Sequence, residues 1–442
     1  MYVDNDILKR SNFLDHKNKS KGYVYPPDVK LSDVYNYLEQ NGTKELFLIV
    51  TEDCNMRCKY CTFSGNYENM REHRQIYMDG KLAKEAIDKY FKNLEKMKRI
   101  NPYLKPTIGF YGGEPLLNFN LIKEIIGYVN EKYGTCFYTL TTNGVLLKGK
   151  IVEFLKENEV AVSISLNGPK KEHDRLRVLP NQHGTFEIVL KNLMDLGEKY
   201  PNYYNKLCSI IVCYDYGSDL VEMVNFFNKH EELLKVIRVN MISSSFTTWY
   251  NQYSKEQKNK FLEMLETLKQ EFFDCLKKKK ENKFLSILFG TQYYLILNRS
   301  INVPLNIIRP KFLPFTGTCM PGMKIAVDPS GNLHCCEKMN YNFPIGNVEK
   351  WLQVEKIKYL MENYNKNVCT ECGSCSITRL CSLCFALTAG IENFEKDPPN
   401  ICEKIKKNIK RQFEEVWDLL EEGVDVFQIL KHSEYRQRGV FI

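Results

Sequence analysis

The stretch LFLIVTEDCNMRCKYC, residues 46–61, decides the fold class. Its first part, residues 46–51, is a continuous apolar run rich in β-branched side chains, which is typical of a strand buried on both faces of a sheet. The run ends directly at Glu52, Asp53 and Cys54. Functional side chains commonly lie on loops at the ends of such strands. We therefore expect a buried parallel strand that leads into a cysteine-bearing loop.

The rest of the N-terminal half repeats this unit. Segments that bring apolar residues back every three or four positions alternate with short apolar runs. The runs lie at 107–111, 136–142, 160–166, 207–213 and 236–241, and the helical segments at 81–98, 121–132, 149–158, 185–200 and 219–230. Strands separated by helices pair in parallel. The predicted fold class is α/β, a partial (β/α)6 TIM-like barrel whose chemistry lies at the carboxyl ends of its strands.

The composition bounds the class of protein. The chain has 442 residues, 43% of them hydrophobic, and a formal net charge of +8. No run approaches the ~18 to 20 apolar residues of a membrane span, and the polar N-terminus lacks the apolar core of a signal peptide. We expect a cytoplasmic protein that binds no membrane. The basic cluster at 277–280 lies in a helical segment interleaved with Glu, which favours a solvated helix face over a nucleic-acid site.

Sixteen cysteines are too many for an ordinary cytoplasmic protein, and twelve of them fall into two groups, which indicates metal binding. The first group, Cys54, Cys58 and Cys61, has the spacing C-x3-C-x2-C. A structural zinc site normally has four ligands, and a disulfide would leave one thiol over. Three thiolates can instead hold a four-iron cluster with one iron open to a small molecule. The triplet, followed by GFYGGEP at 109–115, resembles the signature of the radical S-adenosylmethionine (SAM) superfamily.

This resemblance implies a set of cofactor-binding residues at the strand ends. Gly112 and Gly113 let the backbone approach the ligand, and the carboxylate of Glu114 receives the methionine ammonium. The segments TTNG at 141–144 and SISLNGP at 163–169 also match family patterns. The remaining implied contacts are Tyr60, Asn143 and, for the methionine carboxylate, Ser165 and Arg177. The alternative for each segment is an ordinary glycine or Asn-Gly turn.

The second group follows a proline-interrupted linker, and its region is expected to contain a hairpin with strands at 324–328 and 332–336 around the turn residues 329–331. Its members are Cys319, Cys335, Cys336, Cys369, Cys372, Cys375, Cys381, Cys384 and Cys402. Paired zinc knuckles are the alternative, but the run C-x2-C-x2-C-x5-C-x2-C over 369–384 is denser than such an array, and His334 is the sole candidate histidine. The arrangement resembles the SPASM domain of radical SAM enzymes that act on peptides, a domain that carries two auxiliary four-iron clusters.

The SPASM resemblance implies which cysteines bind each auxiliary cluster. The first set is Cys319, Cys336 and Cys384, and the second set is Cys372, Cys375, Cys381 and Cys402. The first set lacks the usual further cysteine, so either Cys369 supplies a fourth ligand or one iron is open to a substrate thiol. Strand alternation places Cys335 opposite Cys336 and makes it a non-ligand. The other cysteines, Cys136, Cys208, Cys213 and Cys275, are expected to be ordinary buried residues.

The resemblance over residues 46–402 also implies a function. The cofactors would be SAM and three [4Fe-4S] clusters. A 5′-deoxyadenosyl radical would abstract hydrogen from a ribosomally made peptide, and a cysteine thioether would form with electron uptake by the auxiliary clusters. Glu337 follows a predicted ligand where dehydrogenating relatives carry a catalytic base, and the alternative is an exposed hairpin glutamate. Expected partners are a precursor peptide with a leader and an electron donor such as a flavodoxin or ferredoxin.

Two other functions stay open. One is an anaerobic sulfatase-maturing enzyme, which forms formylglycine, although the missing early cysteine of the second group argues against it. The other is a non-catalytic zinc-binding scaffold. The expected organisation is an N-terminal extension (1–45), the barrel (46–245), a helical bridge and linker (246–315), the SPASM domain (316–402) and a C-terminal helix and tail (403–442). The extension is shorter than the leader-binding domain of many maturases, which puts leader recognition by that route in doubt.

Overall fold

The structure is a computed structural model that describes residues 29–98, 105–233, 237–298, 313 and 319–430. Strands that follow one another along the N-terminal half pair in parallel. They are β1 (Glu45–Thr51), β2 (Thr107–Gly112), β3 (Phe137–Thr142), β4 (Ala161–Ser165), β5 (Cys208–Tyr214) and β6 (Ile237–Met241). Each coincides with a run expected from the sequence, and the predicted partial α/β barrel is confirmed.

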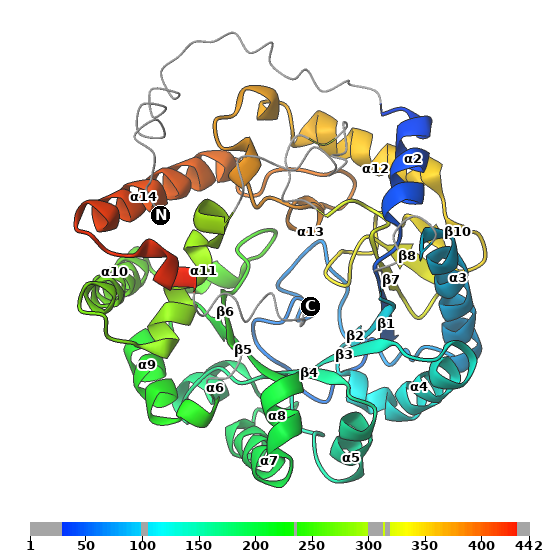
Figure 1. Cartoon of the computed structure of the whole chain (residues 1–442), viewed down its shortest axis with the longest axis horizontal. Coiled ribbons are helices and arrows are strands. Elements are labelled where there is room, and N and C mark those ends of the chain that lie inside the picture. Colours follow the sequence, from blue (N-terminus) through cyan, green and yellow to red (C-terminus); the bar gives the residue numbers. More distant parts are fainter. Residues whose placement is uncertain (1–28, 99–104, 234–236, 299–312, 314–318, 431–442) are drawn as a thin grey trace.

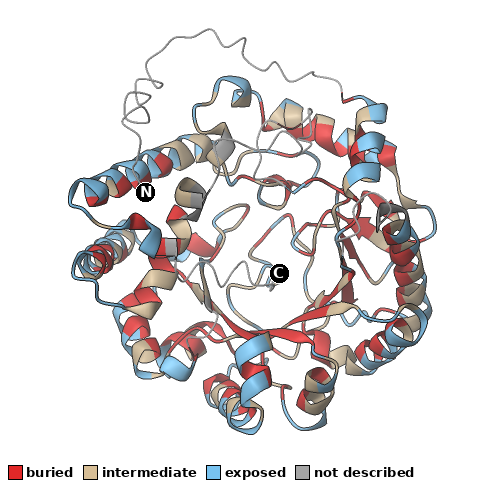
Figure 2. Cartoon of the chain, in the orientation of Figure 1, coloured by how far each residue is buried: buried red, intermediate tan, exposed pale blue. Residues whose placement is uncertain are grey.

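Helices cover the outer face of this sheet, because each connection between parallel strands has to cross over. Those at predicted positions are α3 (Gly80–Lys98), α4 (Phe119–Tyr133), α5 (Lys150–Glu157), α7 (Phe186–Lys199) and α9 (Leu220–Lys229). Unexpected additions are α2 (Leu31–Asn41), α6 (Lys170–Leu176) and α8 (Pro201–Leu207). Figure 1 shows the strands as an arc with helices outside it, and Figure 2 shows the strands largely buried.

β1 is buried on both faces, as its continuous apolar run predicts. Leu46, Leu48 and Val50 are fully buried in the main apolar core between the sheet and the helices. Successive side chains of a strand point to opposite faces, so Phe47 and Ile49 turn to the inside of the barrel. There they form a separate apolar cluster that reaches the C-terminal half of the chain. The inner face of β1 is therefore shared between the two halves.

The cysteine-rich C-terminal region continues the same sheet. β7 (Lys324–Val327) pairs with β1 in parallel, with Lys324 opposite Glu45. The predicted hairpin connects β7 to the antiparallel β8 (Asn332–His334), and the carboxylate of Asp328 accepts two backbone hydrogen bonds across its turn. The sheet edge ends with β9 (Gly346–Asn347) and β10 (Trp351–Leu352). The hairpin was predicted from the sequence, whereas its pairing with β1 was not.

Polar contacts hold this region together and attach it to the loop after the first cysteines and to the segment after β6. The side-chain amides of Asn69 and Asn340 both donate to the carbonyl of Ala389, at 2.6 and 2.9 Å. The hydroxyl of Ser245 donates to the carbonyl of Asp397 at 2.9 Å. The remaining helices are α10 (Lys255–Lys277), α11 (Lys283–Asn298), α12 (Val354–Asn367), α13 (Phe385–Thr388) and α14 (Ile401–Glu421). In Figure 1 the yellow and orange segments lie across the open side of the arc.

Most of the linker expected before residue 316 lies outside the described residues, as do the start and the end of the chain. The division into five segments therefore stays a prediction. Within the described ranges, no helix combines the length and the apolar character that crossing a membrane requires.

Candidate active site

Cys54, Cys58 and Cys61 lie in the loop that follows β1. The backbone amides of Arg57 and Lys59 donate to the carbonyls of Val178 and Leu176, at 2.8 and 2.9 Å, and attach this loop to the end of α6. The backbone amide of Met56 donates to Sγ of Cys54 at 3.4 Å, and that of Phe63 donates to Sγ of Cys61 at 3.4 Å. Such amide contacts stabilise the thiolate form that metal binding requires.

Burial nevertheless raises the pKa of Cys54 and of Cys61 to about 12. The next contribution comes from Glu114 for Cys54 and from Cys58 for Cys61, both of which add negative charge. Thiols in this environment stay protonated at neutral pH unless a positive group binds them, and metal coordination supplies that charge. The donor set therefore fits an iron-sulfur cluster.

The GFYGGEP element lies at the end of β2, directly beside the triplet loop. The amide of Gly113 donates to the carbonyl of Thr51 at 2.9 Å, and the amide of Glu114 to that of Asp53 at 2.8 Å. A Cβ on Gly113 would lie 2.1 Å from the Asp53 oxygen, and one on Gly112, whose φ is +152°, would lie 2.2 Å from the Thr51 oxygen. The described contacts therefore require both glycines for close packing of backbone on backbone. Approach of the same backbone to a ligand stays a prediction.

The carboxylate of Glu114 is buried, with 1% exposure, and connects β2 to the end of β3. It accepts hydrogen bonds from the hydroxyl of Thr142 at 2.8 Å and from the amides of Leu116 and Asn143 at 3.1 and 2.7 Å. Burial raises the pKa of Glu114 to about 7, although these hydrogen bonds lower it. The side-chain amide of Asn143 lies 3.8 Å from Sγ of Cys54. Of these residues, Asn143 directly contacts the triplet, and Glu114 positions it.

Arg177 follows α6 and is 5% exposed. Its Nη1 donates to the hydroxyl of Tyr60 at 2.6 Å, so both predicted cofactor residues lie together. Nε of Arg177 is buried and has no partner within the described residues. Because buried donors normally have acceptors, this N–H fits an oxygen of a bound ligand such as the SAM carboxylate. Ser165, at the carboxyl end of β4, is half-buried.

His173 positions the segment that carries Arg177. Its Nδ1 accepts the backbone amide of Asn167 at 3.3 Å, so Nε2 carries the proton and donates to the hydroxyl of Thr185 at 3.0 Å. That hydroxyl donates to the carbonyl of Arg177 at 3.1 Å. Burial, followed by the charge of Arg177, lowers the pKa of His173 well below its ordinary value. The neutral ring required by this arrangement is therefore the stable form.

The C-terminal cysteines lie in two neighbourhoods. Burial raises the pKa of Cys336 to about 12, with smaller contributions from Glu337 and Cys384, and Cys319 contributes to the raised pKa of Cys384. The members of the second neighbourhood affect one another in the same way, since the pKa of Cys381 is raised to about 11, first by burial and then by the other thiols. Those other thiols are Cys372, Cys375 and Cys402.

Cys369 belongs to the second neighbourhood. Its thiol shares a hydrogen bond with Cys372, which raises the pKa of Cys369 and lowers that of Cys372. In the part of the chain that the structure describes, Cys369 thus lies beside Cys372, and the ligands of the first set stay a prediction. β8 ends at His334, so strand alternation does not extend to Cys335, yet Cys335 still lies in the apolar core with 6% exposure. His334 itself pairs with Asp328 at 2.9 Å.

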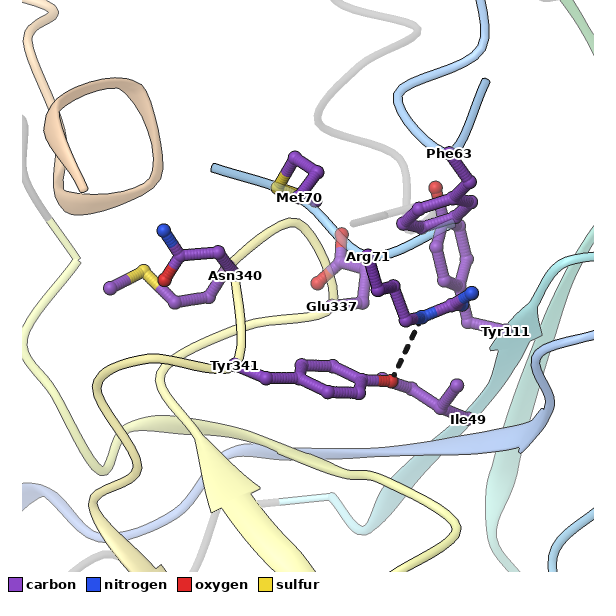
Figure 3. Close-up of a pocket in the computed structure, with 9 residues that line it drawn as sticks. Ile49, Phe63, Met70, Arg71, Tyr111, Glu337, Asn340 and Tyr341 are labelled. Carbon is purple, nitrogen blue, oxygen red and sulfur yellow. Dashed lines mark hydrogen bonds between the residues drawn. The ribbon is translucent and has the colours of Figure 1, made fainter. Parts of the chain in front are cut away.

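A pocket joins the two cysteine regions. Figure 3 shows side chains from three parts of the chain that converge on it. Its lining comprises Ile49 and Tyr111 from the barrel strands, Phe63, Met70 and Arg71 from the loop after the triplet, and Glu337, Met339, Asn340 and Tyr341 from the segment after β8. Glu337 is 5% exposed, which excludes the alternative of an exposed hairpin glutamate. Burial, then the charges of Glu337 and Cys61, raise the pKa of Tyr111, so the ring lies near both regions.

The ammonium group of Lys324 pairs with the carboxylate of Glu337, which lines this pocket. Its Nζ lies 3.3 Å from Oε2 of Glu337 and 3.2 Å from Oε2 of Glu45, and 4.4 Å from the centre of the Phe47 ring. The parallel pairing of β7 with β1 places Lys324 opposite Glu45. The Lys324 ammonium is thus shared by two carboxylates and fixes the position of Glu337.

Sequence reasoning missed Lys324 and Arg71. Lys324 was the first residue of a predicted strand, on the same face as Ala326 by strand alternation. The sequence did not indicate which part of the chain packs against that face. Arg71 follows the triplet in a loop without periodicity, and no sequence signal distinguished it from the neighbouring Arg74.

Known proteins resemble this chain in sequence and fold. Residues 48–227 match the Radical SAM superfamily. The radical SAM cyclopropyl synthase TigE of Paramaledivibacter caminithermalis is 25% identical over 400 residues, 86% of this chain and 76% of TigE. The cysteine-type anaerobic sulfatase-maturating enzyme of Clostridium perfringens (strain ATCC 13124) is 27% identical over 358 residues, 74% of this chain and 84% of that enzyme.

Two further similarities differ in extent. The uncharacterized protein MJ0907 of Methanocaldococcus jannaschii is 42% identical over 130 residues, and the match spans 40% of its length and 29% of this chain. The solved structure of anSMEcpe with bound AdoMet and the Cp18Cys peptide has a TM-score of 0.57 at 19% identity, and the alignment covers 85% of this chain and 98% of anSMEcpe. This last likeness shows a common fold.

The superfamily match begins within β1 and includes the triplet, the Gly-Gly-Glu element and the segment that carries Arg177. The geometry of these elements fits SAM and a [4Fe-4S] cluster, and the zinc-scaffold alternative is set aside. Residues 48–227 therefore form a radical SAM domain, and the protein is a radical SAM enzyme.

Proposed function

We propose that this enzyme matures a ribosomally made peptide by joining a cysteine sulfur to a carbon atom in a thioether. The observation that carries the proposal is the pocket of Figure 3, because both cysteine regions contribute side chains to it. A substrate residue in this pocket would lie next to the triplet loop and next to Glu337. The names of the relatives support a peptide substrate, since anSMEcpe is solved with a bound peptide.

The residues that would hold the cofactors are the predicted ones. The triplet would bind the first cluster, and Asn143 and Arg177 would contact SAM. Cys319, Cys336 and Cys384, and separately Cys372, Cys375, Cys381 and Cys402, would bind two auxiliary clusters. When bound, SAM and these clusters supply a 5′-deoxyadenosyl radical that abstracts hydrogen and an acceptor for the electron that is released. An electron donor such as a flavodoxin or ferredoxin would reduce the protein.

The chain itself supplies a base and a shielded site. The carboxylate of Glu337 would accept the proton of the substrate thiol, because it is buried in the pocket and oriented by Lys324 at 3.3 Å. The aromatic rings of Phe63, Tyr111 and Tyr341 line the same space and would exclude water from a reactive carbon centre.

A second candidate is oxidation of a substrate cysteine to formylglycine. It is favoured by the similarity to the Clostridium perfringens sulfatase-maturating enzyme, of which this chain spans 84%. The first cysteine set supports the thioether instead, because Cys369 lies beside Cys372 and the first set would then supply three protein ligands. An iron with an open position could bind the substrate thiolate before the carbon–sulfur bond forms.

Mass spectrometry distinguishes these reactions. The anaerobically purified protein would be incubated with SAM, dithionite and synthetic copies of the short cysteine-containing peptides encoded beside its gene. The proposal expects a product that has lost two hydrogens and one alkylatable thiol. Loss of sulfur with gain of oxygen would identify formylglycine. Loss of two hydrogens with every thiol still alkylatable would indicate a carbon–carbon ring closure, the reaction for which TigE is named.

A further inference from the structure

Arg71 brings a positive charge into the pocket of Figure 3 and is held there in one orientation. Its guanidinium carbon lies 3.9 Å from the centre of the Phe63 ring and 5.6 Å from that of Tyr341, and its Nε donates to the Tyr341 hydroxyl at 3.3 Å. The side chain is 8% exposed. Because these contacts already fix the planar group, little conformational entropy remains to be lost when a ligand binds it.

Protein contacts use two of the three guanidinium nitrogens. Nε donates to Tyr341, and Nη1 donates to the carbonyls of Glu52 and Glu72 at 3.5 and 3.2 Å. Among the residues that the structure describes, Nη2 has no hydrogen-bond partner. An arginine carries five N–H donors, two of them on Nη2. Two donors of Arg71 are therefore left for a ligand.

The charge of Arg71 is only partly balanced by protein groups. Oε1 of Glu52 lies 3.7 Å from Nε of Arg71, whereas Oε2 of the same carboxylate lies 2.6 Å from Nε of Arg74. One carboxylate thus pairs with two guanidinium groups. Arg71 keeps enough positive charge to attract an oxygen acceptor, and hydrogen bonds from a charged donor are stronger than neutral ones.

The pocket limits what that acceptor is. As it stands, its cavity has a volume of about 10 Å³. A cavity of ~10 to 15 Å³ holds about one water-sized group, so a single atom of a larger substrate fits beside Arg71, whereas a whole small molecule, which needs ~300 Å³ or more, does not. Glu337 lines the same pocket, and a second carboxylate there would be repelled. A neutral carbonyl oxygen meets no such repulsion.

We propose that Arg71 binds, through Nη2, a main-chain carbonyl oxygen of the peptide substrate. The inference rests on the proposed function, since it takes the substrate to be a peptide. Arg71 then sets the position of the peptide main chain and so which carbon faces the triplet side of the pocket. Glu337 and Arg71 have separate tasks, with proton acceptance for the first and main-chain binding for the second.

Steady-state kinetics with the peptide that the wild type modifies tests the assignment. Arg71→Met should raise KM for the peptide roughly 10-fold or more and change kcat much less, because the lost hydrogen bond binds ground state and transition state alike. Arg71→Lys, which keeps the charge but loses the planar guanidinium group, should have a KM between those of the wild type and Arg71→Met. Arg74→Met is the matched control, because Arg74 pairs with the same Glu52 but does not line the pocket.

An unchanged KM in Arg71→Met would overturn the proposal. An equal rise of KM in Arg74→Met would also overturn it, since it would show that both arginines act only by neutralising Glu52. A fall of kcat in Arg71→Met without a change of KM would assign Arg71 to the chemical step instead.

A second experiment needs no turnover. Saturation-transfer NMR measures the binding of N-acetylcysteine amide to the anaerobic holoenzyme. The amide should bind to the wild type and to Arg74→Met, and detectably less to Arg71→Met. Equal binding to all three would refute the carbonyl contact. Arg71-dependent binding of N-acetylcysteine, the free acid, in preference to the amide would show that Arg71 recognises a carboxylate. Arg71-dependent amide binding without modification of any peptide would count against the proposed function alone.

Discussion

Replacing Glu114 with Gln should change how the stability of the protein depends on pH. Burial raises the pKa of Glu114 to about 7, from 4.5 in an unfolded chain. The folded state therefore binds more protons than the unfolded state between these values, and the ionised carboxylate costs stability as the pH rises through this window. The whole window corresponds to about 3 kcal/mol, of which about 1 kcal/mol falls between about pH 6 and about pH 8. Glutamine does not ionise, so Glu114→Gln lacks this dependence.

Urea unfolding of the anaerobic holoprotein at the two pH values measures the difference. Relative to Glu114→Gln, the wild type should lose about 1 kcal/mol of unfolding free energy from about pH 6 to about pH 8, while groups common to both proteins cancel. The matched control is Glu157→Gln on the exposed surface of α5. The assignment of a raised pKa to burial would be refuted if the difference in unfolding free energy between the wild type and Glu114→Gln did not change with pH or changed with the opposite sign. It would also be refuted if the difference between the wild type and Glu157→Gln showed the same slope. Saturating SAM should remove the slope if its ammonium pairs with Glu114, as the sequence predicts.

Three further outcomes follow from the site. Replacing all three triplet cysteines with alanine should abolish release of 5′-deoxyadenosine while roughly eight of about twelve irons per chain remain, measured by iron analysis, and retained release would refute the cofactor site. Gly113→Ala should lower the yield of folded protein and its thermal midpoint, because the new Cβ would lie 2.1 Å from the Asp53 carbonyl, and a midpoint equal to that of the wild type would contradict this packing. Glu337→Gln should lower kcat for peptide modification roughly 100-fold or more while 5′-deoxyadenosine release continues, whereas full peptide turnover would exclude Glu337 as the base.

Much of the barrel could be predicted from the sequence because its signals are local. The run at residues 46–51 and its repeats indicate parallel strands, and the structure places strands there within one or two residues. The triplet, Glu114 and Arg177 were singled out from short motifs, and the fold brings them to one end of the barrel, as parallel strands require. The packing roles of Gly112 and Gly113 were not predictable in the same way, because the atoms that they approach belong to the end of β1 and to the loop directly after it.

The sequence by itself determined the alternation of strands and helices, the candidate thiol ligands and the superfamily, since these depend on spacing between near neighbours in the chain. Only the tertiary structure decided that β7 pairs with β1 and that Lys324 meets Glu337. It also decided that Arg71 and Glu337 share one pocket. These contacts join residues more than ten positions apart, some of them hundreds apart. Packing of distant segments on a common sheet selects such pairs, and no local pattern encodes which surfaces will meet.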